Sequence, residues 1–145
     1  MPFEYYWYTE NNLMGKGMTI TAGIILALHG LVHLMGWVAY WPLADIADLP
    51  YKTTLFNGTW NLGDGGMRIF SVLWLIVALG FVAAAIGVLT RQPWTAQVLV
   101  SATLLSLVIT GLDWGIAFLG TAIDGVVLAA LLVVPRIRSL ALLTQ

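Results

Sequence analysis

The chain has 145 residues, of which 60% are hydrophobic and only 9% are charged. Soluble domains carry about a quarter charged residues, so this composition predicts an integral membrane protein that is embedded in the lipid bilayer. The net charge of −1 offers no basic patch for nucleic acid. The absence of cysteine excludes disulfides, thiol redox chemistry, iron–sulfur ligation and a cysteine nucleophile.

The first segment, residues 1–17, is acidic and aromatic at its start, unlike the basic and then apolar start of a cleaved signal peptide. Dense aromatic side chains favour the headgroup zone of a membrane or a protein interface. We therefore expect this segment to lie at the membrane surface or to dock on a partner, either another membrane subunit or a second copy of the chain. The predicted interface residues are Phe3, Tyr5, Tyr6, Trp7 and Tyr8.

Four apolar segments follow, each close to the roughly 20 residues that a transmembrane helix needs. They are apolar nearly all round, which is typical of helices buried in a membrane. Pro42 and Pro135 should end the first and fourth helices, because proline cannot continue a helix and restricts the residue before it. Pro93 is well placed to open the third. The expected helices cover residues 18–41, 67–90, 94–112 and 120–134. The third helix can extend toward Phe118.

The predicted fold is therefore an all-α membrane protein, a four-transmembrane-helix bundle over residues 18–135 with an N-terminal interfacial aromatic segment. A basic cytoplasmic tail should follow over residues 136–145. The only long connection, residues 42–66, contains the pairs Asn57-Gly58 and Gly65-Gly66, which are turn signals rather than strand signals.

Basic residues in short loops predict the orientation of the bundle, because they are retained in the cytoplasm. With four spans, the N-terminus, the second loop and the C-terminus share one side. The basic residues on that side are Lys16, Arg91, Arg136 and Arg138. We expect that side to be the cytoplasmic face of the inner membrane, with the long first loop on the opposite face.

His29 and His33 stand one helical turn apart in the first span, where polar side chains are costly and need partners or a function. Every other span also carries polar residues at a spacing of three or four, which places them on one helix face. On the third span these are Thr103, Ser106, Thr110 and Asp113. Because lipid disfavours such faces, we expect all of them to point inward and form one polar cluster in the outer half of the bundle. The predicted cluster comprises His29, His33, Arg68, Ser71, Thr110, Asp113, Thr121 and Asp124.

The charges of this cluster do not balance, since Asp113 and Asp124 face the single cation Arg68. Burying an unpaired negative charge costs several kcal/mol. A proton, held either by a carboxyl or by a histidine next to Asp124, would cancel that charge. The cluster is therefore a candidate site for handling protons or for binding a small polar or cationic ligand.

Three interpretations of the histidine pair stay open. The imidazoles can serve a structural role by hydrogen bonding to another helix, or they can belong to the proton or small-ligand site. The third interpretation is a metal site formed by His29, His33 and Asp124, because the i,i+4 spacing can present both imidazoles to one ion. Leu31 and Val32 occupy the positions between the histidines, so the general base of the H-E-x-x-H motif is missing.

A resemblance to a known family rests on three short motifs. They are residues 29–36, Ser71 and Trp74 in the second span, and Gly120-Thr121 shortly before Asp124. This pattern resembles a widespread group of small bacterial four-helix membrane proteins of uncharacterised function, distantly similar to the DoxX type. The resemblance covers most of the chain from about residue 18 onward. It implies a four-helix fold and supplies no activity.

Two functional hypotheses from different classes follow from the sequence. The first is a non-catalytic accessory or structural subunit of a larger membrane assembly or homo-oligomer, which uses the aromatic segment and an apolar helix face. The second is an autonomous protein that binds or transports protons or a small solute at a polar intramembrane site open to the extracytoplasmic side. An enzyme ranks third, because the sequence contains neither a nucleophile with a base nor a cofactor motif.

Overall fold

The computed structural model describes the backbone of residues 3–143 and the side chains of residues 15–133. The protein is an all-α membrane protein, as predicted, and the described residues contain four helices long and apolar enough to cross a membrane. The helices are α1 (Phe3–Tyr40), α2 (Gly63–Leu89), α3 (Thr95–Leu112) and α4 (Trp114–Leu143), and two short strands are β1 (Thr54–Leu55) and β2 (Trp60–Asn61). Their apolar parts are Gly15–Tyr40, Gly63–Leu89, Thr95–Leu112 and Trp114–Val133.

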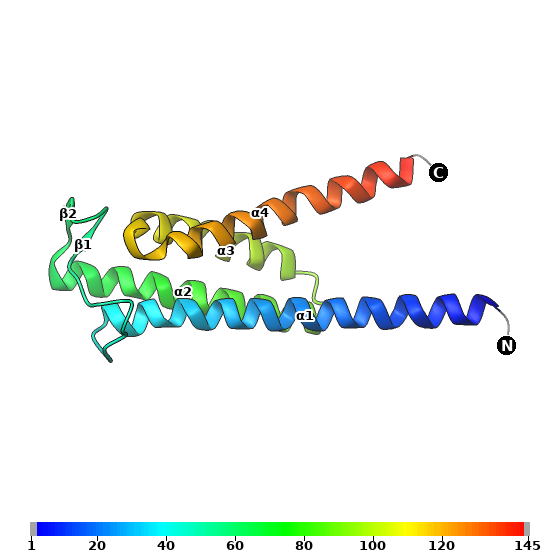
Figure 1. Cartoon of the computed structure of the whole chain (residues 1–145), viewed down its shortest axis with the longest axis horizontal. Helices are drawn as coiled ribbons and strands as arrows, with labels where there is room; N and C mark the ends of the chain where they lie inside the picture. The colour runs from blue at the N-terminus through cyan, green and yellow to red at the C-terminus, as the bar shows by residue number, and fades with distance from the viewer. Residues whose placement is uncertain (1–2, 144–145) are drawn as a thin grey trace.

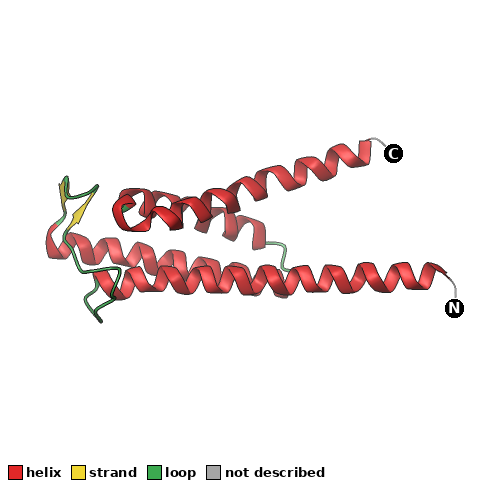
Figure 2. Cartoon of the chain, viewed as in Figure 1, coloured by secondary structure: helices red, strands yellow, loops and turns green. Residues whose placement is uncertain are grey.

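The four helices pack in chain order, α1 on α2, α2 on α3 and α3 on α4 (Figure 1). The two chain ends lie at one end of the bundle, and the loop that carries β1 and β2 lies at the other (Figure 2). There is no extensive backbone contact between α1 and α4, which diverge toward the end that holds both termini. The bundle is therefore least tightly packed along the seam between its first and last helices.

Helix α1 begins at Phe3 and continues without a break to Tyr40. At a rise of 1.5 Å per residue its 38 residues extend about 57 Å, well beyond the roughly 30 Å of a bilayer's hydrocarbon core. The N-terminal segment expected at the interface is thus helical and continuous with the first span. The predicted partner-interface side chains, Phe3, Tyr5, Tyr6, Trp7 and Tyr8, lie outside the residues whose side chains are described.

The boundaries predicted for the third and fourth helices are wrong in three places. Helix α3 ends at Leu112 without extending to Phe118. Helix α4 begins at Trp114 with a single turn, in which the backbone N–H groups of Ile116 and Ala117 both donate to the Asp113 carbonyl at 3.0 Å each, and the helix kinks at Ala117. It also continues past Pro135, since a proline that costs one helix hydrogen bond can be tolerated within a long apolar helix. The basic residues placed in a separate tail, Arg136 and Arg138, therefore lie within α4 itself.

The loop between α1 and α2 contains the turn predicted at Asn57-Gly58 and a hairpin that was not predicted. The turn predicted at Gly65-Gly66 is wrong, because both residues lie inside α2. Asn57 and Gly58 adopt positive φ angles of 52° and 92°, and they connect β1 to β2, in which Leu55 pairs with Trp60. The Tyr51 hydroxyl donates a 2.6 Å hydrogen bond to Asp64 at the start of α2. This hydrogen bond raises the pKa of Tyr51 above its ordinary value, because it stabilises the protonated hydroxyl. The hairpin escaped prediction because its strands have only two residues each.

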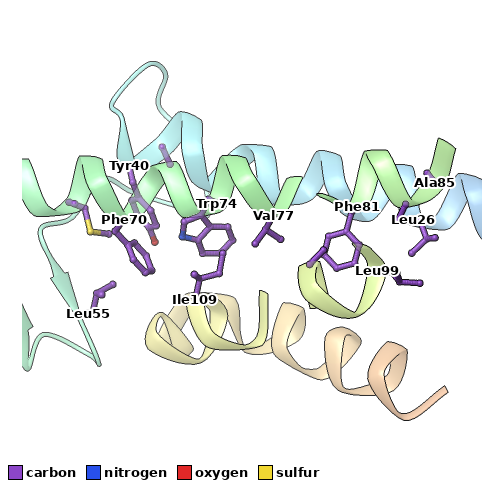
Figure 3. Close-up of a cluster of buried hydrophobic side chains, with 14 residues drawn as sticks. Leu26, Tyr40, Leu55, Phe70, Trp74, Val77, Phe81, Ala85, Leu99 and Ile109 are labelled. Atoms are coloured by element: carbon purple, nitrogen blue, oxygen red, sulfur yellow. The ribbon is translucent and has the colours of Figure 1, made fainter. Parts of the chain in front are cut away.

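Large side chains of α2 form the core of the bundle, with Trp74, Val77 and Phe81 in a row along the helix (Figure 3). Helix α1 comes close to this row because it has glycine at the contact points. A Cβ atom on Gly36 would lie 2.3 Å from the Trp74 ring, and one on Gly30 would lie 2.9 Å from a backbone oxygen of α2. This close approach holds the histidine-bearing face of α1 against α2.

Candidate functional site

Four polar side chains from three helices meet inside the bundle, and we call them the inner cluster: His29 and His33 of α1, Ser106 of α3 and Asp124 of α4. The His29 Nε2 atom lies 2.8 Å from Asp124 Oδ1 and 3.2 Å from His33 Nε2. Ser106 Oγ lies 2.9 Å from His33 Nε2 and donates a 2.5 Å hydrogen bond to Asp124 Oδ2. The predicted convergence of the histidine pair and Asp124 is therefore present. Direct contact with Asp124 is made by His29, whereas His33 reaches it through Ser106 and His29.

Aromatic rings of α2 fix the orientation of the two imidazoles. The ring of Phe81 stacks on His33 at 5.5 Å and meets His29 edge-on at 4.5 Å. The ring of Trp74 lies 5.5 Å from the His33 ring. Packing against large rigid side chains restricts the rotamers that each imidazole can adopt. The apolar core thus directs both Nε2 atoms toward the same point.

Asp124 is completely buried, at 0% exposure. No lysine or arginine among residues 15–133 lies within ion-pair distance of its carboxylate, whose only partner of that kind is His29. A buried carboxylate is stable only if it is paired or hydrogen-bonded, or if it takes up a cation. The inner cluster therefore presents its negative group to His29 and to any cation that enters.

A cavity of about 260 Å³ connects the inner cluster to the surface between α1 and α4. Both histidines form part of its wall, together with Trp74 of α2, Thr110 of α3 and Gly120 of α4. Ile46, Asp48 and Leu49, from the loop between α1 and α2, border the cavity at the loop end of the bundle. A small solute can therefore reach the cluster from the loop side without crossing the tightly packed core.

Two buried nitrogen atoms on the cavity wall residues have no hydrogen-bond partner within residues 15–133: His33 Nδ1 and Trp74 Nε1. His33 is only 1% exposed and Trp74 only 4%. Buried polar atoms are paired in most cases, with protein groups or with bound water or ligand. Their occurrence on two neighbouring residues of one cavity indicates that the protein groups alone do not complete this site.

A second group of polar residues lies nearer the loop, and we call it the outer cluster: Tyr40, Lys52 and Asp113. Asp113 is buried and accepts hydrogen bonds from the Tyr40 hydroxyl and from the Lys52 ammonium group, which also forms its ion pair. The prediction of one polar cluster is thus wrong, because the two aspartates occupy separate sites. Arg68, the predicted counter-ion, is exposed to solvent or lipid and takes part in neither cluster.

The other predicted cluster residues turn their hydroxyl groups to their own helices. Ser71 donates to the Arg68 carbonyl at 2.6 Å, Thr110 to the Ser106 carbonyl at 2.8 Å, and Thr121 to the Ala117 carbonyl at 3.3 Å. The polar stripe of α3 does face inward, as predicted. The four buried residues of the stripe are Thr103, Ser106, Thr110 and Asp113.

The prediction omitted three residues that matter. Ser106 was in the stripe but not among the site candidates, and it is the stripe hydroxyl that reaches another helix in the inner cluster. Tyr40 and Lys52 were not predicted as site residues, because their contact with Asp113 depends on how the loop folds back over the bundle. One signal was available for Lys52, which is the only lysine of the long loop and thus the nearest alternative counter-ion for a buried aspartate.

The inner cluster can bind a cation, because it combines a carboxylate with two imidazole nitrogens at the wall of an accessible cavity. Its ligating atoms, from His29, His33 and Asp124, all lie within 4.8 Å of one another. The outer cluster has its charges paired and holds the loop in place. Comparisons with protein-family models, curated proteins and solved structures found no match to this chain, so the resemblance to the DoxX type stays a prediction and the site is interpreted from its own chemistry.

Proposed function

We propose that the protein binds a small cationic solute in the membrane, at the inner cluster, and that the solute enters from the extracytoplasmic side through the cavity between α1 and α4. The observation that carries this proposal is the complete burial of Asp124 without a lysine or arginine partner in residues 15–133. Intramembrane acidic residues of this kind mark ion and substrate sites. The function is binding or transport without covalent chemistry.

Two further features support this proposal. The cavity has the small size expected for an ion or a compact solute, and most of its wall is apolar, with Asp48 at its loop end. The unpartnered nitrogen atoms of His33 and Trp74 provide additional polar groups for a solute or for the water that accompanies it. A purely structural hydrogen-bond network would require neither the cavity nor the unpartnered atoms.

The proposal is tested by thermal unfolding of the full chain in lipid nanodiscs against sodium, potassium, a primary amine, a quaternary ammonium ion and divalent metal salts at matched ionic strength. We expect at least one of these cations to raise Tm in a saturable way, because ligands that bind only the folded state stabilise it. The shift should disappear in Asp124→Asn and in Gly120→Leu, whose new side chain would fill the cavity. It should persist in Asp45→Asn, an exposed loop variant. Absence of a saturable shift with every cation would refute the proposal.

The second candidate function is the one placed first by the sequence, a structural subunit, here of a homo-oligomer. It is favoured by α4, whose apolar span is only 6% buried within one chain, compared with 39% for α2. A further apolar groove of about 440 Å³ separates α1 from α4 toward the end with the termini. Because the chain lacks cysteine, Val126→Cys on the exposed face of α4 offers a clean test. Disulfide-linked dimers in native membranes would support this role, and a monomer by native mass spectrometry would exclude it.

A further inference from the structure

We infer that the solute of the inner cluster is a divalent transition metal ion, with His29, His33 and Asp124 as its three protein ligands. This inference rests on the proposed function and names the class of cation. It follows from the distances between the ligand atoms, from the number of protons that the cluster can hold and from the types of donor atom present.

Two of the three pairs of ligand atoms are already spaced like neighbouring ligands of one metal ion. With metal–ligand bonds of 2.0–2.1 Å, neighbouring ligand atoms lie about 2.9 to 3.4 Å apart in octahedral or tetrahedral coordination. The two histidine Nε2 atoms are separated by 3.2 Å, and His29 Nε2 lies 2.8 Å from Asp124 Oδ1. All three ligand atoms lie within 4.8 Å of one another, so side-chain rotation alone can bring the third pair to the spacing that one ion requires.

Hydrogen bonds can satisfy this arrangement only if both Nε2 atoms carry hydrogens, with His29 donating to Asp124 and His33 to Ser106. An imidazole Nε2 carries either one hydrogen or one lone pair, so it makes one good hydrogen bond. Each Nε2 here has two polar neighbours: Asp124 and His33 for His29, and His29 and Ser106 for His33. The two N–H donors then have their nitrogen atoms only 3.2 Å apart, and His33 Nδ1 has no partner among residues 15–133. A cation that accepts lone pairs from both nitrogens and from the carboxylate satisfies all three groups at once.

The donor set selects the kind of ion. Calcium and magnesium prefer oxygen ligands, whereas imidazole nitrogen suits zinc, copper, iron and nickel. Two histidines and one carboxylate are a set that holds zinc or ferrous iron and leaves coordination positions open. The negative charge of Asp124 offsets half the charge of a divalent ion.

The remaining coordination positions have access to the cavity, because both histidines form part of its wall. Structural zinc sites are closed by four protein ligands, whereas sites with three protein ligands keep a position for water or an exchangeable ligand. The inner cluster therefore has the composition of an exchangeable metal site. Metal ions can enter and leave by the same route as the proposed solute.

Equilibrium dialysis of the full chain in nanodiscs with Zn²⁺, and with Co²⁺ as a spectroscopic probe, tests this inference. The protein must carry no polyhistidine tag, because the chain has only two histidines and both are ligands here. We expect one Zn²⁺ per chain and intense Co²⁺ absorption bands typical of low coordination number. Loss of a ligand in His33→Gln or His29→Gln should weaken Zn²⁺ binding at least about 100-fold, since even outer-shell partners are worth 10–100-fold.

Thr103→Val is the matched control, because Thr103 is buried on the same face of α3, its hydroxyl donates to its own helix and it does not line the cavity. It should bind Zn²⁺ like the unaltered chain. If Zn²⁺ and Co²⁺ do not bind while an amine or a monovalent cation stabilises the protein, the metal inference is wrong and the proposed function stands. If no cation of any kind binds, both fail. Equal Zn²⁺ binding by the histidine variants would also overturn the inference, and a Tm for each variant confirms that it is folded.

Discussion

Two buried aspartates of this protein are stabilised in different ways. Asp113 forms an ion pair with Lys52 and accepts a hydrogen bond from Tyr40, so its charge is matched within the chain. Among residues 15–133, Asp124 has only His29 and Ser106 as hydrogen-bonding partners, and it lies next to a cavity. The structural role therefore belongs to Asp113, and the candidate binding role to Asp124.

Removing Lys52 should destabilise the protein, because Asp113 would remain buried without a cation. Breaking a buried pair costs about 3–5 kcal/mol, and the partly exposed Lys52 side chain, at 23%, should bring the loss to about 2 kcal/mol. We expect Lys52→Met to lower the free energy of unfolding by that amount, as measured by denaturant titration of the protein in mixed micelles. The double variant Lys52→Met/Asp113→Asn should lose less than the sum of the two single variants.

Arg68→Met provides the control for this pair, because Arg68 is an exposed cation at the same end of the bundle that does not contact Asp113. Its effect on the free energy of unfolding should stay within about 0.5 kcal/mol. If Arg68→Met proved as harmful as Lys52→Met, the assignment of Lys52 as the counter-ion of Asp113 would be wrong.

The helices are the part of the structure that the local sequence determines most directly. Apolar length predicted the number of spans, and the spacing of Thr103, Ser106, Thr110 and Asp113 predicted the buried face of α3. The partners of those residues could not be predicted. A threonine hydroxyl in a helix can donate a hydrogen bond to the backbone carbonyl four residues earlier. Thr103 and Thr110 both do so. Which stripe member crosses to a neighbouring helix depends on the packing of three helices.

The path of the loop between α1 and α2 explains why Arg68 was wrongly predicted as the counter-ion. Its position at the start of α2 suggested an inward-facing cation, but the loop after α1 brings Lys52 to Asp113 first. The path of this loop depends on the positive φ angles at Asn57 and Gly58 and on the Phe56 N–H bond to the Leu112 carbonyl, at 3.0 Å. The turn itself was predicted, but the bond from Phe56 to Leu112 is long-range and carries no periodic signal in the sequence.

The contact between α1 and α2 should be sensitive to any side chain at Gly36. A Cβ atom there would lie 2.3 Å from the Trp74 ring, so the helices must separate or the indole must move. We expect Gly36→Ala to lower the free energy of unfolding by about 1–3 kcal/mol, as overpacking usually does. It should also weaken cation binding, because Trp74 packs on His33. The measurements are denaturant unfolding and the cation-dependent Tm shift.

Gly125→Ala is the matched control on α4, next to Asp124, because nothing lies within 4 Å of the position its Cβ would take. It should leave stability unchanged or raise it by up to about 1 kcal/mol through better helix propensity. If Gly36→Ala were equally harmless, the close approach of α1 and α2 would not be required for the fold.

The bundle as a whole is open along one seam. Helices α1 and α4 lack extensive backbone contact, and the His29–Asp124 contact connects them. On one side of this contact the cavity opens toward the loop, and on the other side the apolar groove extends toward the termini. A binding site at a bridging contact can couple occupancy to the separation of two helices. An ion held by both helices would close the seam, and its release would allow them to part.

The orientation of the bundle in the membrane is the last prediction, and it decides from which side the solute enters. The basic-residue rule places the loop between α1 and α2 outside and the α2–α3 turn inside. Because the chain has no cysteine, Asn57→Cys and Gln92→Cys each give a single reactive site at an exposed position of one of these connections. In intact cells, a membrane-impermeant maleimide should label Asn57→Cys, and Gln92→Cys should react only after permeabilisation. The reverse pattern would place the cavity on the cytoplasmic side.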